Sequence, residues 1–182
     1  PPAMPSSPAG SPGPGRHSGR LSRPCPAPRP MSDAHEHHRL QSLLDAMPPV
    51  TAMGIRLVRL DAAGLRLEAP LARNVNDKGC AFGGSLASLL TLAAWGVLES
   101  RLRQAGIEAE VYVARSELEY LSPLYEDLAA EAPPPEASAF SDLLEKLRAR
   151  GRGGIVLTAE ARDAGGRVAA RLQGRYAAVL RR

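Results

Sequence analysis

The chain has 182 residues, which suits one ordinary domain with residues to spare. It carries 23 basic and 19 acidic side chains, but four of the arginines lie within residues 1–30, where no acidic residue occurs, so residues 31–182 carry no net charge. A neutral domain lacks the electrostatic footprint that a phosphate backbone requires, which disfavours a nucleic-acid-binding function. Hydrophobic residues make up 44% of the chain, which is typical of a globular protein and too many for a disordered one.

Two cysteines, Cys25 and Cys80, are too few for a disulfide scaffold or a Cys-rich zinc site. Reduced thiols fit a cytoplasmic location. The four histidines all precede residue 40, and the cluster His35-Glu-His-His38 has no spacing that fixes a ligand geometry. We therefore predict neither a metal site nor a cofactor.

Residues 1–30 hold ten prolines and four glycines and contain no apolar run of secretory length. Such a composition buries too little apolar surface to offset its chain entropy, so we expect a disordered extension there and a folded domain over residues 31–182. The uncharged stretch at residues 79–98 is apolar only from Leu86 to Leu98. A helix of that length spans ~20 Å, short of the ~30 Å hydrocarbon core, so we expect a buried helix and no membrane span.

The residue pattern predicts helices and strands in a mixed order. A helix near residues 40–47 has one apolar face at positions i, i+3, i+4 and i+7, and two prolines stop it. The later elements are strands over 55–60 and 65–69, a loop over 71–84, a long helix over 85–103, strands over 112–121 and 127–132, a short amphipathic helix over 140–147, and strands over 155–161 and 168–176. Ser138 or Ser141 is the expected N-cap of the short helix, and Gly151 its end.

The predicted strands alternate apolar and polar residues, as at Ile155, Leu157 and Ala159, so each presents one face to water. An antiparallel sheet with one solvent-exposed face must bury its other face. The helix at 85–103 is apolar on nearly every side, so we expect it to pack against that face. We predict an α+β fold in which a curved antiparallel sheet wraps around one long central helix.

The loop that leads into this helix carries the most distinctive motif. Residues 76–85 read Asn-Asp-Lys-Gly-Cys-Ala-Phe-Gly-Gly-Ser, Trp95-Gly96 follows within the helix, and residues 120–123 read Tyr-Leu-Ser-Pro. With the order of elements, these residues resemble the hot-dog fold thioesterases. More narrowly, they resemble the putative thioesterase family whose domain also follows a GNAT acetyltransferase domain in some bacterial proteins. The resemblance spans about residues 40–180.

The resemblance implies a homodimer or homotetramer whose sheets join edge to edge, with an acyl-CoA or acyl-carrier-protein thioester bound at the dimer interface. In the best-known hot-dog thioesterases an Asn precedes a His-Gly-Gly, and an acidic residue follows nine positions after the His. Asn76, Gly83 and Gly84 match that pattern here, but Phe82 stands in place of the His and Thr91 in place of the acid. The usual base is therefore absent from its usual place.

Thioester hydrolysis requires donors for the negative charge that develops on the carbonyl oxygen. The backbone N–H groups at a helix start are unpaired, and glycines let a substrate approach the backbone closely. We therefore predict that the amide of Gly83 or Gly84 forms the oxyanion hole. The alternative is that both glycines only allow a tight turn into a packed helix.

Water also has to be activated or held in place. Asp77 is the only carboxylate in the loop and is the first candidate for the general base, with Asn76 holding the water or the carbonyl. The alternative for Asp77 is a solvated carboxylate, or one that fixes the turn through an Asx hydrogen bond. Cys80 has no histidine in the core to activate it, so we interpret it as a buried thiol.

The candidate substrate-binding residues are Lys78, Phe82, Ser85, Ser88, Thr91 and Arg115. Lys78 is a candidate to bind a CoA phosphate, and the alternative is a lysine that is only solvated. Ser85, Ser88 and Thr91 form a polar stripe that either faces the substrate or packs closely and bonds the carbonyl four residues earlier. Glu117 and Glu119 share a strand face with Arg115. They form a surface ion-pair ladder, which we favour, or they supply an acid across a dimer interface.

Two rival functions stay open at this stage. The first is a non-catalytic acyl-CoA-binding or regulatory module on the same fold, which Phe82 and Thr91 at the usual catalytic positions make credible. The second is a hydratase or dehydratase that acts on acyl thioesters. It ranks lower because those hot-dog enzymes generally rely on a histidine that this core lacks.

Overall fold

The computed structural model describes residues 33–181. Its elements are α1 (Asp33–Asp45), α2 (Pro48–Met53), β1 (Arg56–Asp61), β2 (Gly64–Ala69), η1 (Leu71–Arg73), α3 (Gly83–Gln104), β3 (Ala109–Tyr120), β4 (Leu128–Ala132), α4 (Ala137–Arg150), β5 (Arg152–Arg162) and β6 (Val168–Leu180). The extension predicted over residues 1–30 lies outside the described residues. No helix of residues 33–181 is long and apolar enough to cross a membrane.

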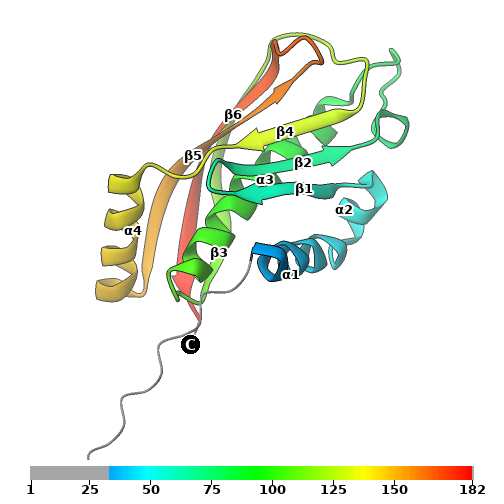
Figure 1. The fold of residues 1–182 in the computed structure, drawn as a ribbon. Coiled ribbons are helices and arrows are strands. Elements are labelled where there is room, and N and C mark those ends of the chain that lie inside the picture. Colours follow the sequence, from blue (N-terminus) through cyan, green and yellow to red (C-terminus); the bar gives the residue numbers. More distant parts are fainter. Residues whose placement is uncertain (1–32, 182) are drawn as a thin grey trace, which may run out of the picture.

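Six strands form one antiparallel sheet in the order β1-β2-β4-β5-β6-β3. The sheet curves around α3, which packs against its inner face, while α1 lies beside β1 and α4 beside β5 (Figure 1). This confirms the predicted α+β arrangement of a curved antiparallel sheet around one long helix. Because β1 and β3 are the end strands, each leaves one edge without a strand partner within residues 33–181.

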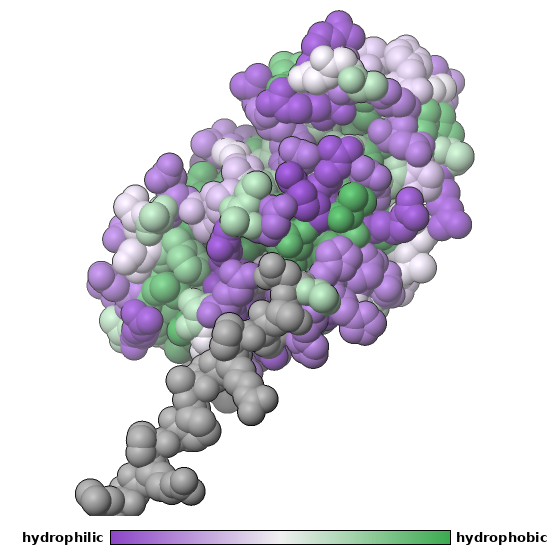
Figure 2. All heavy atoms as spheres, viewed as in Figure 1, coloured by the Kyte–Doolittle hydropathy of each residue, from purple (hydrophilic) through white to green (hydrophobic). Residues whose placement is uncertain are grey.

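The alternation of residues separates the two faces of the sheet. In β5, Ile155, Leu157 and Ala159 are buried, while Val156 and Thr158 between them are exposed. The buried apolar side chains of α3 meet this inner face; they are Leu86, Leu89, Leu90, Ala93, Ala94, Val97, Leu98 and Leu102. Each fully buried leucine contributes ~1.5–3 kcal/mol, so this layer is the main source of stability. Hydrophilic side chains cover most of the surface in view in Figure 2, with smaller apolar areas between them.

Some element boundaries differ from the prediction. Pro48 opens α2 instead of only stopping α1, because proline suits the first turn of a helix. α3 begins at Gly83, earlier than the predicted start at residue 85. The predicted N-cap of α4 is wrong: Glu136 is the residue before the helix and makes no side-chain cap, so Ser138 and Ser141 lie inside the helix, which starts soon after a run of prolines.

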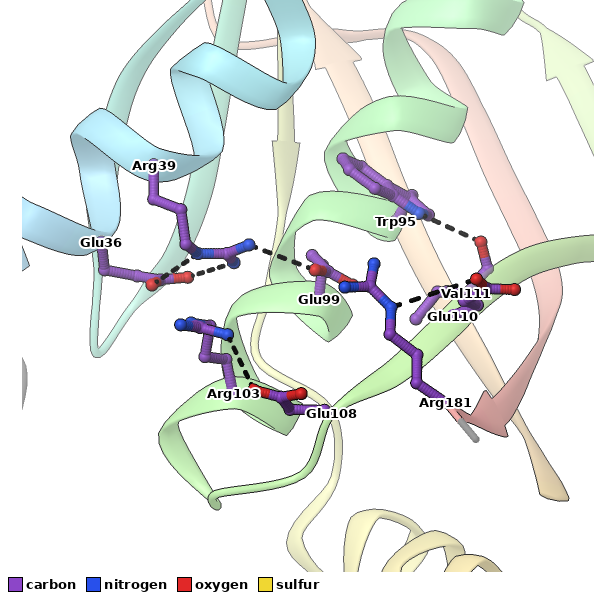
Figure 3. A network of polar contacts seen from close by, with 9 residues as sticks. All are labelled: Glu36, Arg39, Trp95, Glu99, Arg103, Glu108, Glu110, Val111 and Arg181. Carbon is purple, nitrogen blue, oxygen red and sulfur yellow. Dashed lines mark hydrogen bonds and ion pairs between the residues drawn. The ribbon is translucent and has the colours of Figure 1, made fainter. Parts of the chain in front are cut away.

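A part-buried ion cluster joins α1 to α3 (Figure 3). Glu36 on α1 is 2% exposed, and its carboxylate accepts hydrogen bonds from Nε and Nη2 of Arg39 at 2.9 and 2.6 Å. Arg39 also donates to Glu99 on α3 at 3.3 Å. The hydrogen bonds that Arg39 donates to Glu36 raise the pKa of Arg39 above its ordinary value, and burial only partly opposes the shift. The cluster fixes α1, a helix with many polar residues, against the core.

Replacing Arg39 by Met should lower the free energy of unfolding by about 3 kcal/mol, because it leaves the Glu36 carboxylate buried without a partner. Urea unfolding at pH 7 measures the change. The matched control is Arg175→Met, since Arg175 is exposed on β6 and makes no ion pair with any residue from 33 to 181. That variant should stay within about 0.5 kcal/mol of the parent. An equal loss in both variants would contradict the role of the cluster.

Candidate functional site

The loop at residues 74–82 leads into α3 and is anchored by Asn74. This residue is 2% exposed, and its Nδ2 donates to the carbonyls of Met53 and Pro70, each at 2.8 Å. Its backbone carbonyl accepts from the N–H of Phe82 at 2.7 Å. Asn74 thus ties both ends of the loop to α2. No sequence pattern predicts this role for Asn74, because one more polar residue in an Asn- and Gly-rich loop gives no local sign of burial.

Asn76 shapes the tip of the same loop. Its Oδ1 accepts from the backbone N–H of Lys78 at 2.8 Å and of Cys80 at 3.2 Å, and its Nδ2 lies 3.2 Å from the Sγ of Cys80. This is an Asx-type turn, the arrangement considered above for Asp77. The Asn76 side chain is therefore engaged within the loop. The Cys80 thiol is free and buried, as predicted.

Asp77 and Lys78 lie in solvent at the loop tip. Their side chains are 80% and 73% exposed and form an ion pair with 3.0 Å between Nζ and Oδ1. An exposed pair of this kind contributes little to stability. A competing charge can therefore separate Asp77 from Lys78 at small cost.

The first turn of α3 contains both glycines of the motif. Phe82 precedes the helix and provides no side-chain cap. The amides of Ser85 and Leu86 donate to the Phe82 carbonyl at 3.0 and 3.1 Å, but the N–H groups of Gly83 and Gly84 have no acceptor in the described part of the chain. Two unpaired N–H groups at the positive end of a helix form a position that favours negative charge.

The ring of Phe82 lies over the backbone at Gly84. A Cβ there would overlap the ring, so a larger residue at position 84 would require this side chain to move. The Phe82 side chain is itself 55% exposed. Phe82, which occupies the position of the usual histidine, therefore borders the free amides.

An apolar cavity of about 320 Å³ adjoins Gly83. Its lining residues are Ala81, Gly83, Leu86, Tyr120, Leu121, Ser122, Pro123 and Leu124. The Oη of Tyr120, the last residue of β3, donates to the Gly83 carbonyl at 3.0 Å. Because Tyr120 is the only titratable residue in this lining, the cavity suits an uncharged apolar group. Tyr120 belongs to one of the sequence motifs, but the motif alone does not predict it as a site residue.

A larger hollow of about 560 Å³ lies elsewhere, on the outer face of β2, β4 and β5. Charged side chains dominate its walls and pair with one another: Arg66 with Glu68 and Glu131, and Arg162 with Glu160. Such walls do not suit an acyl chain. Within residues 33–181, no group of three or more His, Cys, Asp or Glu side chains is placed to hold a metal ion.

Local contacts occupy much of the polar stripe on α3. The Ser88 hydroxyl donates to the Gly84 carbonyl at 2.9 Å, and Ser85 is 7% exposed. The Thr91 carbonyl accepts from the hydroxyl of Tyr176 at 3.0 Å. Burial raises the pKa of Tyr176, so this hydroxyl stays protonated and can donate. These contacts agree with the packing alternative, although Ser88 and Thr91 are only half-buried.

Arg115, Glu117 and Glu119 lie on the outer face of β3, on the opposite side of the sheet from α3. Arg115 pairs with Glu117 at 2.6 Å, and Glu119 pairs with Arg171 at 3.4 Å, as in the predicted surface ladder. The structure therefore brings Phe82, the two glycines and Tyr120 together, and it separates Arg115 from them within one chain.

Comparisons with known proteins agree with the fold. A family model described as "Putative thioesterase (yiiD_Cterm)" matches residues 37–180. No curated protein matches the chain significantly. A protein of unknown function from Chlorobaculum tepidum TLS is 24% identical with a TM-score of 0.75, over 80% of this chain and 94% of that one. A putative thioesterase from Shewanella oneidensis is 22% identical with a TM-score of 0.71, over 80% and 99%.

A more distant thioesterase from Haemophilus influenzae is 15% identical with a TM-score of 0.61, over 79% of this chain and 90% of that one. At such identities the similarities establish the fold, and they confirm the predicted hot-dog architecture.

Replacing Asn74 by Ala should lower the free energy of unfolding by about 2 kcal/mol, because the carbonyls of Met53 and Pro70 lose their donor in a part-buried place. Asn76→Ala is the matched comparison. It removes hydrogen bonds near the exposed loop tip and should cost about 1 kcal/mol or less. Denaturant titration of both variants measures the difference. A larger loss for Asn76→Ala would contradict the anchoring role of Asn74.

Proposed function

Because the chain belongs to the putative thioesterase family (yiiD_Cterm), we propose that it hydrolyses an acyl thioester at the first turn of α3. The acyl group is carried by CoA or by an acyl-carrier protein. The observation that carries the proposal is the pair of unpaired N–H groups, at Gly83 and Gly84, beside an apolar cavity.

The backbone at the helix start fits the electrostatic demand of the reaction. Attack of water on the carbonyl carbon turns the carbonyl oxygen into an oxyanion, which needs donors that are already in place. The N–H of Gly83 or Gly84 donates to this oxygen, and the dipole of α3 adds to the field. Collapse of the tetrahedral intermediate breaks the C–S bond and leaves a carboxylic acid and a free thiol. Loss of one such donor costs ~2.7–4 kcal/mol in well-studied enzymes, so these amides can supply a large share of the rate.

The acyl chain occupies the cavity beside Gly83. Ala81, Leu86 and Leu124 are buried apolar residues in its wall. A carboxylate at the far end of the acyl chain would lose its hydration there without gaining a partner. The proposed substrates are therefore thioesters of uncharged acyl groups.

The proposed site lies at an interface with a second copy of the chain. The outer edge of β3 has no strand partner among the described residues, and Tyr112 and Val113 on this strand are 54% and 43% exposed. Two such edges can pair and join the sheets of a homodimer. In that arrangement Arg115, Glu117 and Glu119 stay on the outer face of the joined sheet, away from α3 of either chain, so the substrate-binding role predicted for Arg115 is not proposed.

Asp77 is the proposed general base. The exposed ion pair with Lys78 is weak, so a phosphate group of CoA can draw Lys78 away and free the carboxylate to accept a proton from water. Asn76 holds the loop in the shape that presents Asp77. Phe82 contacts the thioester beside Gly84, and the stripe of Ser85, Ser88 and Thr91 borders the path of the substrate along α3.

Binding of an acyl thioester without turnover is the second candidate function. One observation favours it: apart from Tyr120, no side chain that lines the cavity ionises. A pocket without a base can still hold a ligand.

Release of free thiol from acyl-CoAs and acyl-carrier proteins of short to long chain length tests hydrolysis. The full chain should turn over one chain-length class, and Asp77→Ala should lower kcat by ~10²–10⁴-fold, the contribution typical of a general base. Asp142→Ala, which removes an exposed carboxylate from α4, is the matched control and should leave kcat unchanged.

Each alternative gives a different result in this assay. Activity that survives Asp77→Ala would retain the enzyme and refute this base. If no thioester is hydrolysed but acyl-CoA raises the melting temperature, the protein binds acyl-CoA without hydrolysing it.

The charge of the acyl group should decide the specificity. Butyryl-CoA and succinyl-CoA carry four-carbon acyl groups, but only the second ends in a carboxylate. We expect kcat/KM for butyryl-CoA to be at least about 100-fold higher, because burial of an unpaired carboxylate costs several kcal/mol. Steady-state kinetics with both substrates measure the ratio, and comparable values would contradict an apolar acyl site.

A further inference from the structure

Tyr120 makes a defined long-range contact although its side chain is exposed. It ends β3 at the edge of the sheet and is 55% exposed. Its hydroxyl nevertheless donates to the carbonyl of Gly83 at 3.0 Å, across 37 positions of the sequence. Its ring also packs on Gly83, where a Cβ would lie 3.5 Å from the ring carbon Cε1. A ring this exposed gains little stability from burial. The contact therefore matters for the Gly83 backbone that it holds in place.

The first turn of α3 has little intrinsic stability. Two consecutive glycines lose more conformational entropy in a helix than any other residues, and no side chain caps the turn. Backbone hydrogen bonds at 2.7 Å fix the residues just before it, from Phe82 to Asn74 and from Ala81 to Leu124. Among the described residues, Tyr120 is the only side chain from another element that bonds to the turn itself.

We propose that Tyr120 is a positioning residue that locks the first turn of α3 and so aligns the Gly83 and Gly84 amides before substrate binds. This inference rests on the proposed function. Donors to an oxyanion contribute most when their geometry is fixed in advance, and small displacements lose much of the effect. The lock uses the carbonyl of Gly83, which has two lone pairs, and leaves both N–H groups free for the substrate.

The hydroxyl and the ring of Tyr120 have separable roles. The ring lines the cavity, so removal of the whole side chain would change the acyl site as well as the lock. Tyr120→Phe removes only the hydrogen bond. Tyr125→Phe is the matched control, because Tyr125 follows in the next segment, is 66% exposed, and its hydroxyl makes no hydrogen bond with residues 33–181.

Steady-state kinetics test the lock with a thioester that the parent protein hydrolyses. Tyr120→Phe should lower kcat by about tenfold, as expected for one lost hydrogen bond, with KM within about twofold and the melting temperature within about 2 °C. Tyr125→Phe should change none of the three. An unchanged kcat in Tyr120→Phe overturns the proposal. A higher KM at unchanged kcat also overturns it, since that marks a residue that only binds substrate.

Amide hydrogen exchange gives a readout that needs no turnover. Exchange over residues 83–90 should be at least about fivefold faster in Tyr120→Phe than in the parent protein, and unchanged in Tyr125→Phe. If the parent protein hydrolyses no thioester, the proposed function fails, but the exchange comparison still decides whether Tyr120 holds the turn. Unchanged exchange in Tyr120→Phe overturns the lock in either case.

Discussion

An antiparallel sheet with one polar face is stable only if apolar side chains cover its other face, and in this protein one helix provides them. Leu89, Leu90 and Leu98 on α3 are fully buried against the curved sheet. Because the N–H groups further along α3 bond to the helix's own carbonyls, free backbone donors occur only in its first turn. The candidate site therefore lies where the helix that fills the core begins.

The chain holds this helix end through contacts from outside the helix. Asn74 anchors the loop before it, the Phe82 ring covers Gly84, and Tyr120 bonds to Gly83. A glycine in a helix costs about 1 kcal/mol relative to alanine, so two in the first turn are a local weakness. The same two residues leave the backbone open to a ligand. These two glycines lower the stability of the helix start and keep its backbone accessible where the proposed chemistry needs it.

The sequence was sufficient to predict the fold because the relevant signals are local and periodic. The alternation in β5 and β6 and the apolar helix between hairpins require a sheet around a helix, and the structure has that arrangement. The start of α3 at Gly83 and the start of α4 at Ala137, without a side-chain cap, were not predictable. The first depends on contacts made by distant residues, and the second lacks the side-chain cap that the sequence pattern favoured.

The site was predictable only where the motif itself carries it. The glycines and Phe82 follow one another in the chain, so the sequence indicates a helix start with open amides. The contact of Tyr120 with Gly83 and the burial of Asn74 depend on tertiary structure and have no local pattern. Asp77 stays a predicted base, since a single chain surrounds it only with solvent and Lys78.

A thioester site at the first turn of α3 can be tested by the response of the Gly83 and Gly84 amide resonances to a stable acyl-CoA analogue in which a methylene group replaces the thioester sulfur. This analogue keeps the carbonyl oxygen and cannot be hydrolysed. Such a site predicts that one or both glycine amide protons shift downfield with saturation, as expected for a new hydrogen bond to that oxygen. Saturable shifts elsewhere, with both glycine amides unchanged, would contradict it.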